Sequence, residues 1–104
     1  MAENQNFQEM QILEQNLQNL LMQKQAFQME QAETESALEE IEKSGDEIFK
    51  IIGQLMIKTE KSKIKEELGN KKRIIELRLN TIEKQENSLT EQLEKIRNKV
   101  MKKK

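Results

Sequence analysis

The sequence predicts a mainly α-helical protein, a long antiparallel two-helix coiled coil with one central β-hairpin. Two stretches repeat apolar residues at alternating spacings of three and four, and the segment between them is rich in β-branched residues around one glycine. No proline interrupts either repeat in the 104 residues. We expect a single domain over residues 1–104, with helices over about 5–43 and 60–101 and a hairpin over about 48–59.

The first predicted helix carries a heptad repeat that begins at Met10. Its a and d positions are Met10, Leu13, Leu17, Leu20, Lys24, Phe27, Gln31, Thr34, Leu38 and Ile41. A 3-4 spacing held over this length is typical of a helix in a coiled coil. We expect the helix to stop at Ser44-Gly45-Asp46, with Gly45 in a left-handed conformation after the last turn.

Two short apolar runs, 48–52 and 55–59, flank the dipeptide Gly53-Gln54 and predict two strands joined by a two-residue turn. Glycine at the first loop position suits a type II′ turn, because that position needs a positive φ. This turn would place Ile48 opposite Thr59. The alternative is that the segment continues as helix in one long rod.

Both faces of the predicted hairpin are largely apolar. The residues concerned are Ile48, Phe49, Ile51, Ile52, Leu55, Met56 and Ile57. An isolated two-stranded hairpin is marginally stable in water and has two open edges. We therefore predict that these side chains are assembly residues and that the hairpin pairs with strands of other chains.

The second predicted helix begins near Thr59 or Ser62, either of which would suit its N-cap. Its heptad positions are Leu68, Lys72, Ile75, Leu79, Ile82, Glu86, Leu89, Leu93, Ile96 and Val100. Because a hairpin reverses the chain, the helices must run antiparallel, and facing residue numbers sum to about 106. Lys24 would then reach Glu86 along the seam of a and d side chains. Gly69 lies inside this helix for no reason that the sequence shows.

The composition argues against several classes of function. Eighteen basic and nineteen acidic residues leave a net charge of −1, so no overall field favours nucleic acid or an anionic membrane. The absence of His and Cys removes the common general base, the thiol nucleophile and the usual transition-metal ligands. With no export signal or apolar span in the sequence, we expect a cytoplasmic protein that is not an enzyme and has no cofactor, metal, nucleic-acid or membrane partner.

Several apolar residues lie outside the seam, where a two-helix rod does not need them. They are Phe7, Ile12, Leu21, Met22, Met29, Ile74, Leu77 and Met101. One explanation is loose extra packing or contact with neighbouring chains. The other is that those on the half of the coiled coil away from the hairpin contact an apolar partner. Flexible Met side chains suit a partner of variable shape.

The order helix, hairpin, helix resembles the prefoldin family, most of all its archaeal β subunits. The residues that carry the resemblance are Ala37-Leu38-Glu39-Glu40-Ile41-Glu42, Ile48-Phe49-Lys50, Gly53, Leu55-Met56-Ile57-Lys58-Thr59, Leu77-Arg78-Leu79-Asn80 and Glu83-Lys84-Gln85-Glu86. The resemblance implies a hexamer of two α-type and four β-type subunits, in which the hairpins join an intersubunit β-barrel. It also implies a chaperone whose coiled-coil arms hold unfolded proteins without ATP and deliver them to a group II chaperonin.

Carried onto this chain, the resemblance assigns the hairpin to assembly and the arm tips to unfolded clients. The client-binding residues would be Phe7, Met10, Ile12, Leu13, Ile96, Val100 and Met101. The residues alone lead to the same division, because one end needs other chains and the other carries apolar groups where fraying exposes them. The alternative function is a structural coiled-coil adaptor that binds one defined helical partner. A membrane-surface protein is disfavoured by the net charge.

Overall fold

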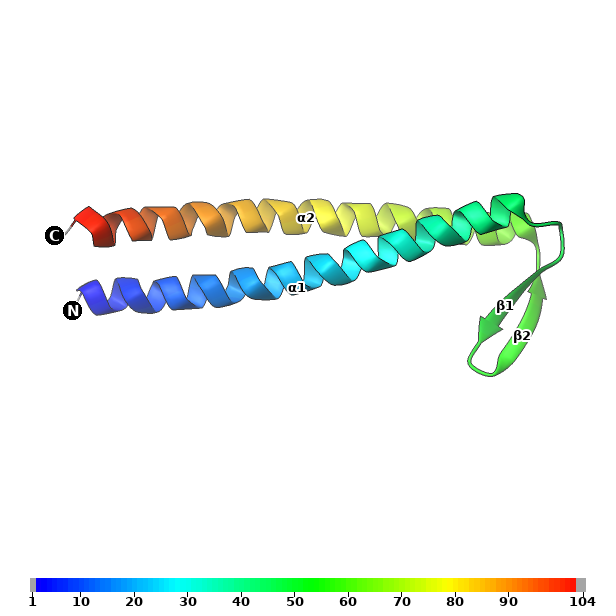
Figure 1. The fold of residues 1–104 in the computed structure, drawn as a ribbon, viewed down its shortest axis with the longest axis horizontal. Helices are drawn as coiled ribbons and strands as arrows, with labels where there is room; N and C mark the ends of the chain where they lie inside the picture. The colour runs from blue at the N-terminus through cyan, green and yellow to red at the C-terminus, as the bar shows by residue number, and fades with distance from the viewer. Residues whose placement is uncertain (1, 103–104) are drawn as a thin grey trace. The chain divides into compact units, whose positions relative to one another are not determined.

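The computed structural model describes residues 2–102, which form two helices and one antiparallel sheet of two strands (Figure 1). The order is α1 (Ala2–Lys43), β1 (Ile48–Ile52), β2 (Leu55–Thr59) and α2 (Lys61–Lys102). The predicted fold of two long helices around a central hairpin is confirmed, and a continuous helical rod is wrong. α1 ends at the predicted residue, and the other three helix ends differ from the predicted ones by one to three residues, as helix boundaries commonly do.

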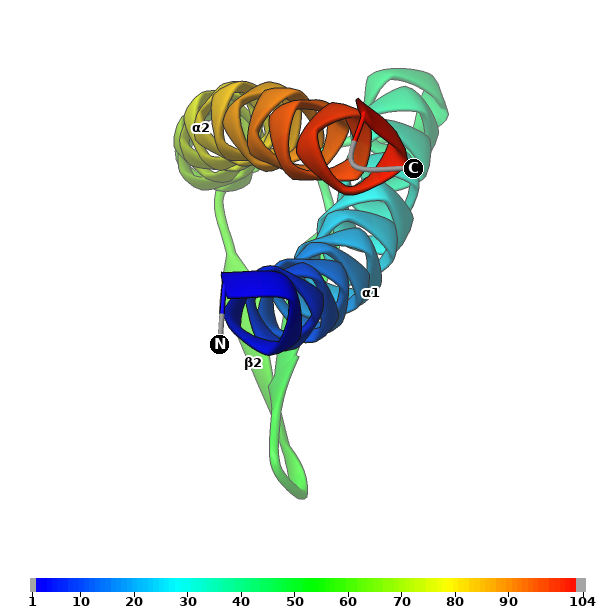
Figure 2. The same cartoon turned by 90° about the vertical axis from the view of Figure 1, so that its left-hand side faces the viewer.

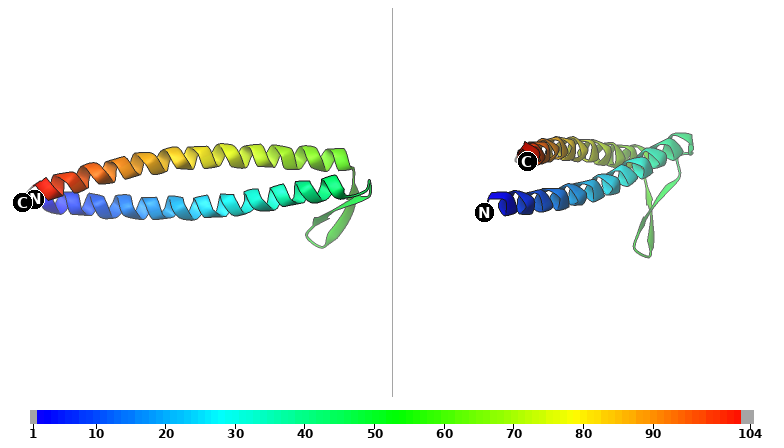
Figure 3. Two further views of the ribbon diagram at one scale, coloured as in Figure 1. Left: turned by 45° about the horizontal axis from the view of Figure 1, so that its top comes forward. Right: turned by 60° about the vertical axis from the view of Figure 1, so that its left-hand side comes forward.

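The chain divides into two compact units, each built from a part of both helices. The terminal unit comprises the residues up to Ala26 and those from Arg78 onward, and the hairpin unit is Phe27–Leu77. Within each unit the α1 and α2 stretches run side by side in opposite directions, as the views in Figure 3 show. The start of α1 and the end of α2 therefore lie at the same end of the terminal unit.

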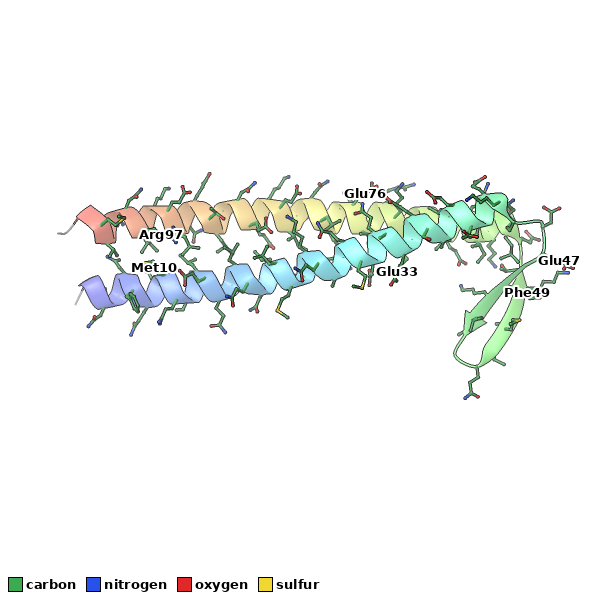
Figure 4. All side chains as sticks on the ribbon, viewed as in Figure 1. Met10, Glu33, Glu47, Phe49, Glu76 and Arg97 are labelled. Atoms are coloured by element: carbon green, nitrogen blue, oxygen red, sulfur yellow. The ribbon has the colours of Figure 1, made fainter. Side chains whose placement is uncertain are left out.

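In the terminal unit, burial follows the predicted seam. Ile82 and Leu93 of α2 are 4% and 6% exposed, and the facing seam positions of α1 are half-buried between exposed neighbours. These half-buried positions are Met10, Leu13, Leu17, Leu20 and Lys24. Figure 4 shows Met10 on the side of α1 that faces α2. The seam loosens at Val100, which is 39% exposed although it occupies an a position.

In the hairpin unit, the most buried seam residues are Ile75 and Thr34, at 2% and 3% exposure. The Thr34 hydroxyl donates to the backbone carbonyl of Glu30 over 2.7 Å, so its burial leaves the hydroxyl proton satisfied. Figure 4 places Glu33 and Glu76 on the outer sides of the two helices. The heptad therefore separates a buried seam, which includes the polar Thr34, from a charged outer surface.

The end of α1 differs from the expectation, because Gly45 does not adopt a positive φ. Ser44 closes the helix instead. Its backbone N–H donates to the carbonyl of Ile41 over 3.2 Å, and its hydroxyl donates to the same oxygen over 2.8 Å. The Lys61 ammonium donates to the Ser44 carbonyl over 3.0 Å. Polar groups of Ser44 and Lys61 thus satisfy two carbonyls that the helix leaves open, and no left-handed residue is needed.

The start of α2 also differs from the expected caps. Thr59 belongs to β2 and Ser62 is the second residue of the helix, so neither takes the N-cap position. Glu60 takes it, and its carbonyl accepts the backbone N–H of Ile64 over 3.1 Å. Further along α2, a Cβ added at Gly69 would meet no atom within 4 Å, so nothing in the structure explains the glycine.

The hairpin has the predicted register and turn. Ile48 pairs with Thr59 and Ile52 with Leu55, which leaves Gly53 and Gln54 as the loop. Gly53 has a φ of 60°, and no other described residue has a positive φ. A type I′ turn needs positive φ at both loop residues, whereas a type II′ turn needs it only at the first, so the turn is of type II′.

Candidate functional sites

The hairpin presents its apolar side chains to solvent. Six of the seven predicted assembly residues are exposed, and Ile51, Leu55 and Met56 keep 69%, 66% and 67% of their surface open. The seventh, Ile48, is half-buried. Figure 2 shows the two strands as a thin ribbon that projects from the helices of the hairpin unit. An apolar group of this size on an exposed element is typical of a contact surface for another chain.

The backbone of the hairpin is open as well. Each of the two strands has one neighbour, so among the described residues the outer edge of each strand lacks a strand partner. The peptide groups along such an edge can pair with a strand from another chain. The hairpin therefore combines exposed apolar faces with two free edges.

An ion pair joins the hairpin to α2. The Lys50 ammonium of β1 donates to a Glu67 carboxylate oxygen of α2 over 3.1 Å, and both side chains are about half exposed. Lys50 shares its strand face with Ile48 and Ile52, so this face turns toward α2. Phe49 and Ile51 lie on the opposite face, and Figure 4 shows Phe49 on β1. The sequence alone does not predict this contact, because it depends on the angle between the hairpin and α2.

Two further ion pairs join the helices of the hairpin unit. Lys65 pairs with Glu42, and Lys72 lies 3.8 Å from a Glu35 carboxylate oxygen. The hydrogen bond and charge of Lys65 lower the pKa of Glu42 below its ordinary value. These side chains are well exposed, so each pair adds little stability on its own.

The terminal unit holds the seven predicted client-binding residues. Phe7, Ile12 and Met101 are about 60% exposed at 59%, 59% and 63%, and Val100 is also exposed. The remaining three, Met10, Leu13 and Ile96, are seam positions and are half-buried. The set therefore mixes open side chains with partly covered ones, and their role in client binding stays a prediction.

Three of these residues come together in one groove. Ile12 and Leu13 of α1 and Ile96 of α2 line a groove between the two helices, which we call the end groove. Its other lining residues are Glu9, Gln92, Lys95 and Lys99. Phe7, Met10, Val100 and Met101 do not line it. The charged part of this lining was not among the predicted site residues, although Glu9 and Lys99 occupy positions that flank the seam in the heptad.

A second groove lies on the same side of the terminal unit and is lined mainly by amides. We call it the amide groove, and its lining residues are Asn16, Asn19, Leu20, Gln23, Gln85, Ser88 and Leu89. Heptad spacing relates the two grooves, because Glu9, Asn16 and Gln23 recur at intervals of seven along α1. Gln85, Gln92 and Lys99 do so along α2. A side-chain amide N–H of Gln92 also donates to the Ser88 hydroxyl over 3.5 Å and links the two grooves.

The predicted polar contact inside the seam is present. The Lys24 ammonium donates to one carboxylate oxygen of Glu86 over 3.4 Å, with side-chain exposures of 25% and 18%. The other oxygen of Glu86 is buried without a hydrogen-bond partner. A charged pair among apolar seam residues fits one alignment of the helices better than slipped ones, because slippage would bury one charge without the other.

The described residues offer surfaces for binding proteins. Among them no three His, Cys, Asp or Glu side chains are placed to hold a metal ion. Neither described helix is both long and apolar enough to cross a membrane. What the side chains supply is exposed apolar area, free strand edges and flanking charge, which suit non-covalent association with other polypeptides.

Comparisons with known proteins agree with this arrangement. A family model described as prefoldin subunit matches residues 4–104. Prefoldin subunit beta of Thermococcus onnurineus is 45% identical over 89 residues, which cover 84% of this chain and 77% of that protein. Prefoldin subunit beta of Sulfurisphaera tokodaii is 39% identical over 93 residues, which cover 88% and 74%.

A solved structure shares the fold as well. The crystal structure of the prefoldin beta subunit from Thermococcus strain KS-1 superposes with a TM-score of 0.90 at 34% sequence identity. The match covers 97% of this chain and 90% of that one. The resemblance seen in the sequence is therefore confirmed by the family model, by sequence relatives and by structure: the chain belongs to the prefoldin subunit family and has the fold of its β subunits.

Proposed function

We propose that this chain is the β-type subunit of a cytoplasmic prefoldin hexamer that captures unfolded proteins without ATP and delivers them to a group II chaperonin. Its family membership supports a chaperone function. The observation that supports the assembly and the capture of unfolded proteins is the exposure of two separate sets of apolar side chains. One lies on the hairpin and the other on the terminal unit.

The hairpin set supports assembly with other subunits. Hiding a Leu, Ile or Met side chain from water contributes about 1.5–3 kcal/mol, and six such residues and Phe49 lie on the hairpin. A strand added at a free edge would also supply backbone hydrogen bonds. We propose that the partners are further copies of this chain and an α-type prefoldin subunit, with two α-type and four β-type chains whose hairpins form a β-barrel.

The terminal set supports client capture. Phe7, Ile12 and Met101 are exposed and do not take part in the hairpin. Flexible Met side chains and a seam that loosens at Val100 suit clients of different shape. A holdase of this kind needs affinity for apolar segments and no chemical step, which is what exposed apolar side chains provide.

The test is aggregation of several unrelated denatured proteins, followed by light scattering in the presence of the assembled complex. We expect suppression at near-stoichiometric amounts without nucleotide. Replacement of Phe7 and Met101 by Ser should weaken capture roughly thirtyfold, because two contacts worth about 1 kcal/mol each are lost, while the mass of the complex stays unchanged.

The matched control is Met29→Ser with Ile74→Ser, which removes two exposed apolar side chains of the hairpin unit outside both proposed surfaces. It should leave capture unchanged. An adaptor for one defined helical partner would suppress none of the aggregating proteins, and that result would overturn the proposal. Dissociation of the complex by the Phe7 and Met101 changes would contradict the division between client binding and assembly.

A further inference from the structure

The end groove carries a surplus of positive charge beside its apolar floor. Lys95 and Lys99 line it from α2, and Glu9 is the acidic residue in its lining. Neither lysine makes an ion pair within 4.0 Å among the described residues. Both side chains are exposed, so their charges are available to a molecule in the groove.

The apolar part of the end groove's lining comes from three residues and is partly open. Ile12 is 59% exposed, and the seam residues Leu13 and Ile96 are half-buried. An apolar side chain seated here would cover Ile12 and the exposed parts of the other two. Because Lys95 and Lys99 line the same groove, a carboxylate next to that side chain in the bound segment would come near an ammonium group.

The neighbouring amide groove adds no charge of either sign. Its polar lining consists of Asn, Gln and Ser side chains, which both donate and accept hydrogen bonds. A polypeptide that continued from the end groove into the amide groove would find hydrogen-bond donors and acceptors for its backbone groups. The amide groove would not select for the charge of that polypeptide. The charge preference of the combined surface is therefore set by Lys95 and Lys99 against Glu9.

We infer that the end groove takes apolar client segments that carry acidic residues, in preference to equally apolar segments that carry basic ones. This inference rests on the proposed client-binding function and names the class of segment that the site selects. Exposed charge pairs are individually weak, so the preference is modest and adds to the apolar contact.

The test uses the assembled complex and three fluorescently labelled peptides of equal length and identical apolar residues. The remaining positions carry Asp, Ser or Lys. Fluorescence anisotropy should show the Asp peptide binding about fivefold more tightly than the Lys peptide, with the Ser peptide between them. In about 1 M salt, where the Debye length is roughly 3 Å, the difference should largely disappear while the Ser peptide still binds.

Variants of the two lysines locate the effect. Lys95→Gln with Lys99→Gln should remove the preference for the Asp peptide over the Lys peptide, and Lys95→Glu with Lys99→Glu should reverse it. The matched control is Lys84→Gln with Lys71→Gln, which removes the same charge from exposed positions that line neither groove. This control should keep the fivefold preference.

The outcomes separate the inference from the function on which it rests. Equal binding of the Asp and Lys peptides to the unaltered complex, or a preference that survives Lys95→Glu with Lys99→Glu, would overturn the inference and leave the holdase intact. Failure of all three peptides to bind, together with no suppression of aggregation, would overturn both.

Discussion

Gly53 is the residue on which the shape of the hairpin depends. Its φ of 60° is a conformation that costs an L-residue about 1–2 kcal/mol, and a Cβ there would meet no atom within 4 Å. Gly53→Ala should therefore act through backbone strain alone. We expect it to raise the subunit concentration needed for half-assembly, measured by sedimentation velocity.

Gly45→Ala is the matched control for that experiment. Gly45 has no positive φ, and a Cβ there would also meet no atom within 4 Å. Assembly of this variant should resemble that of the unaltered chain. Equal assembly midpoints for the two variants would show that the turn at Gly53 does not limit assembly.

The ion pair of Lys24 with Glu86 should affect the stability of the coiled coil. Lys24→Met leaves a largely buried carboxylate whose one oxygen already lacks a partner, and should cost roughly 1–3 kcal/mol of unfolding free energy. Replacing both residues by Leu should recover that loss or exceed it. Urea unfolding followed by circular dichroism at the helix band measures both effects. A double variant less stable than Lys24→Met would contradict this account.

At the scale of the elements, the sequence predicts the helices, and their ends to within three residues, but not the contacts that close the helices. The 3-4 repeat fixes which side of each helix meets the other, and the half-buried positions of α1 follow it from Met10 to Ile41. The end of α1 depends on Ser44 and Lys61, which are 17 residues apart and meet only after the chain has folded. No local pattern encodes such a contact.

The hairpin surface could be predicted from the sequence more fully than the end groove. The exposure of the hairpin residues is predictable, because both faces of the two strands carry apolar side chains. The two helices of one chain cannot cover both faces. The end groove combines Glu9 and Ile12 with Lys95 and Lys99, which come from opposite ends of the sequence. The sequence singles out Ile12 and Ile96 as client-binding residues because they are apolar, but the net charge of −1 for the whole chain does not reveal the two lysines beside them.

The ion pair between Glu42 of α1 and Lys65 of α2 predicts how acid affects the stability of the hairpin unit. The pKa of Glu42 is lowered in the folded protein, chiefly by the hydrogen bond from Lys65 and then by its charge. The carboxylate therefore stabilises the fold above its unfolded pKa of about 4.5, and this contribution is lost as the pH falls through the lower folded value.

Glu42→Gln should remove this part of the acid sensitivity. Thermal unfolding compared at pH 6 and below pH 4 should show a smaller loss for the variant than for the unaltered chain. Because the pair is exposed, the difference should also shrink in high salt. Identical pH profiles for the two proteins would show that the ion pair does not form in solution.

At the scale of the whole molecule, the chain exposes more surface than a folded monomer of its size. It leaves 8500 Å² accessible, whereas a compact protein of 12.3 kDa exposes roughly 6,100 Å². Part of the accessible surface is apolar and lies on the hairpin, where Ile51 and Met56 are about two thirds exposed. The surface area and the family membership both indicate that this protein works as part of an assembly.

The central claim is that the hairpin builds a hetero-oligomer, and native mass spectrometry of the complex purified from its source through a tag on this chain tests it directly. The account predicts four copies of this chain with two copies of a second, slightly larger coiled-coil chain, and loss of that species when Ile51 and Met56 are both replaced by Ser. A monomer or simple dimer bound to one unrelated protein would contradict it and favour an adaptor.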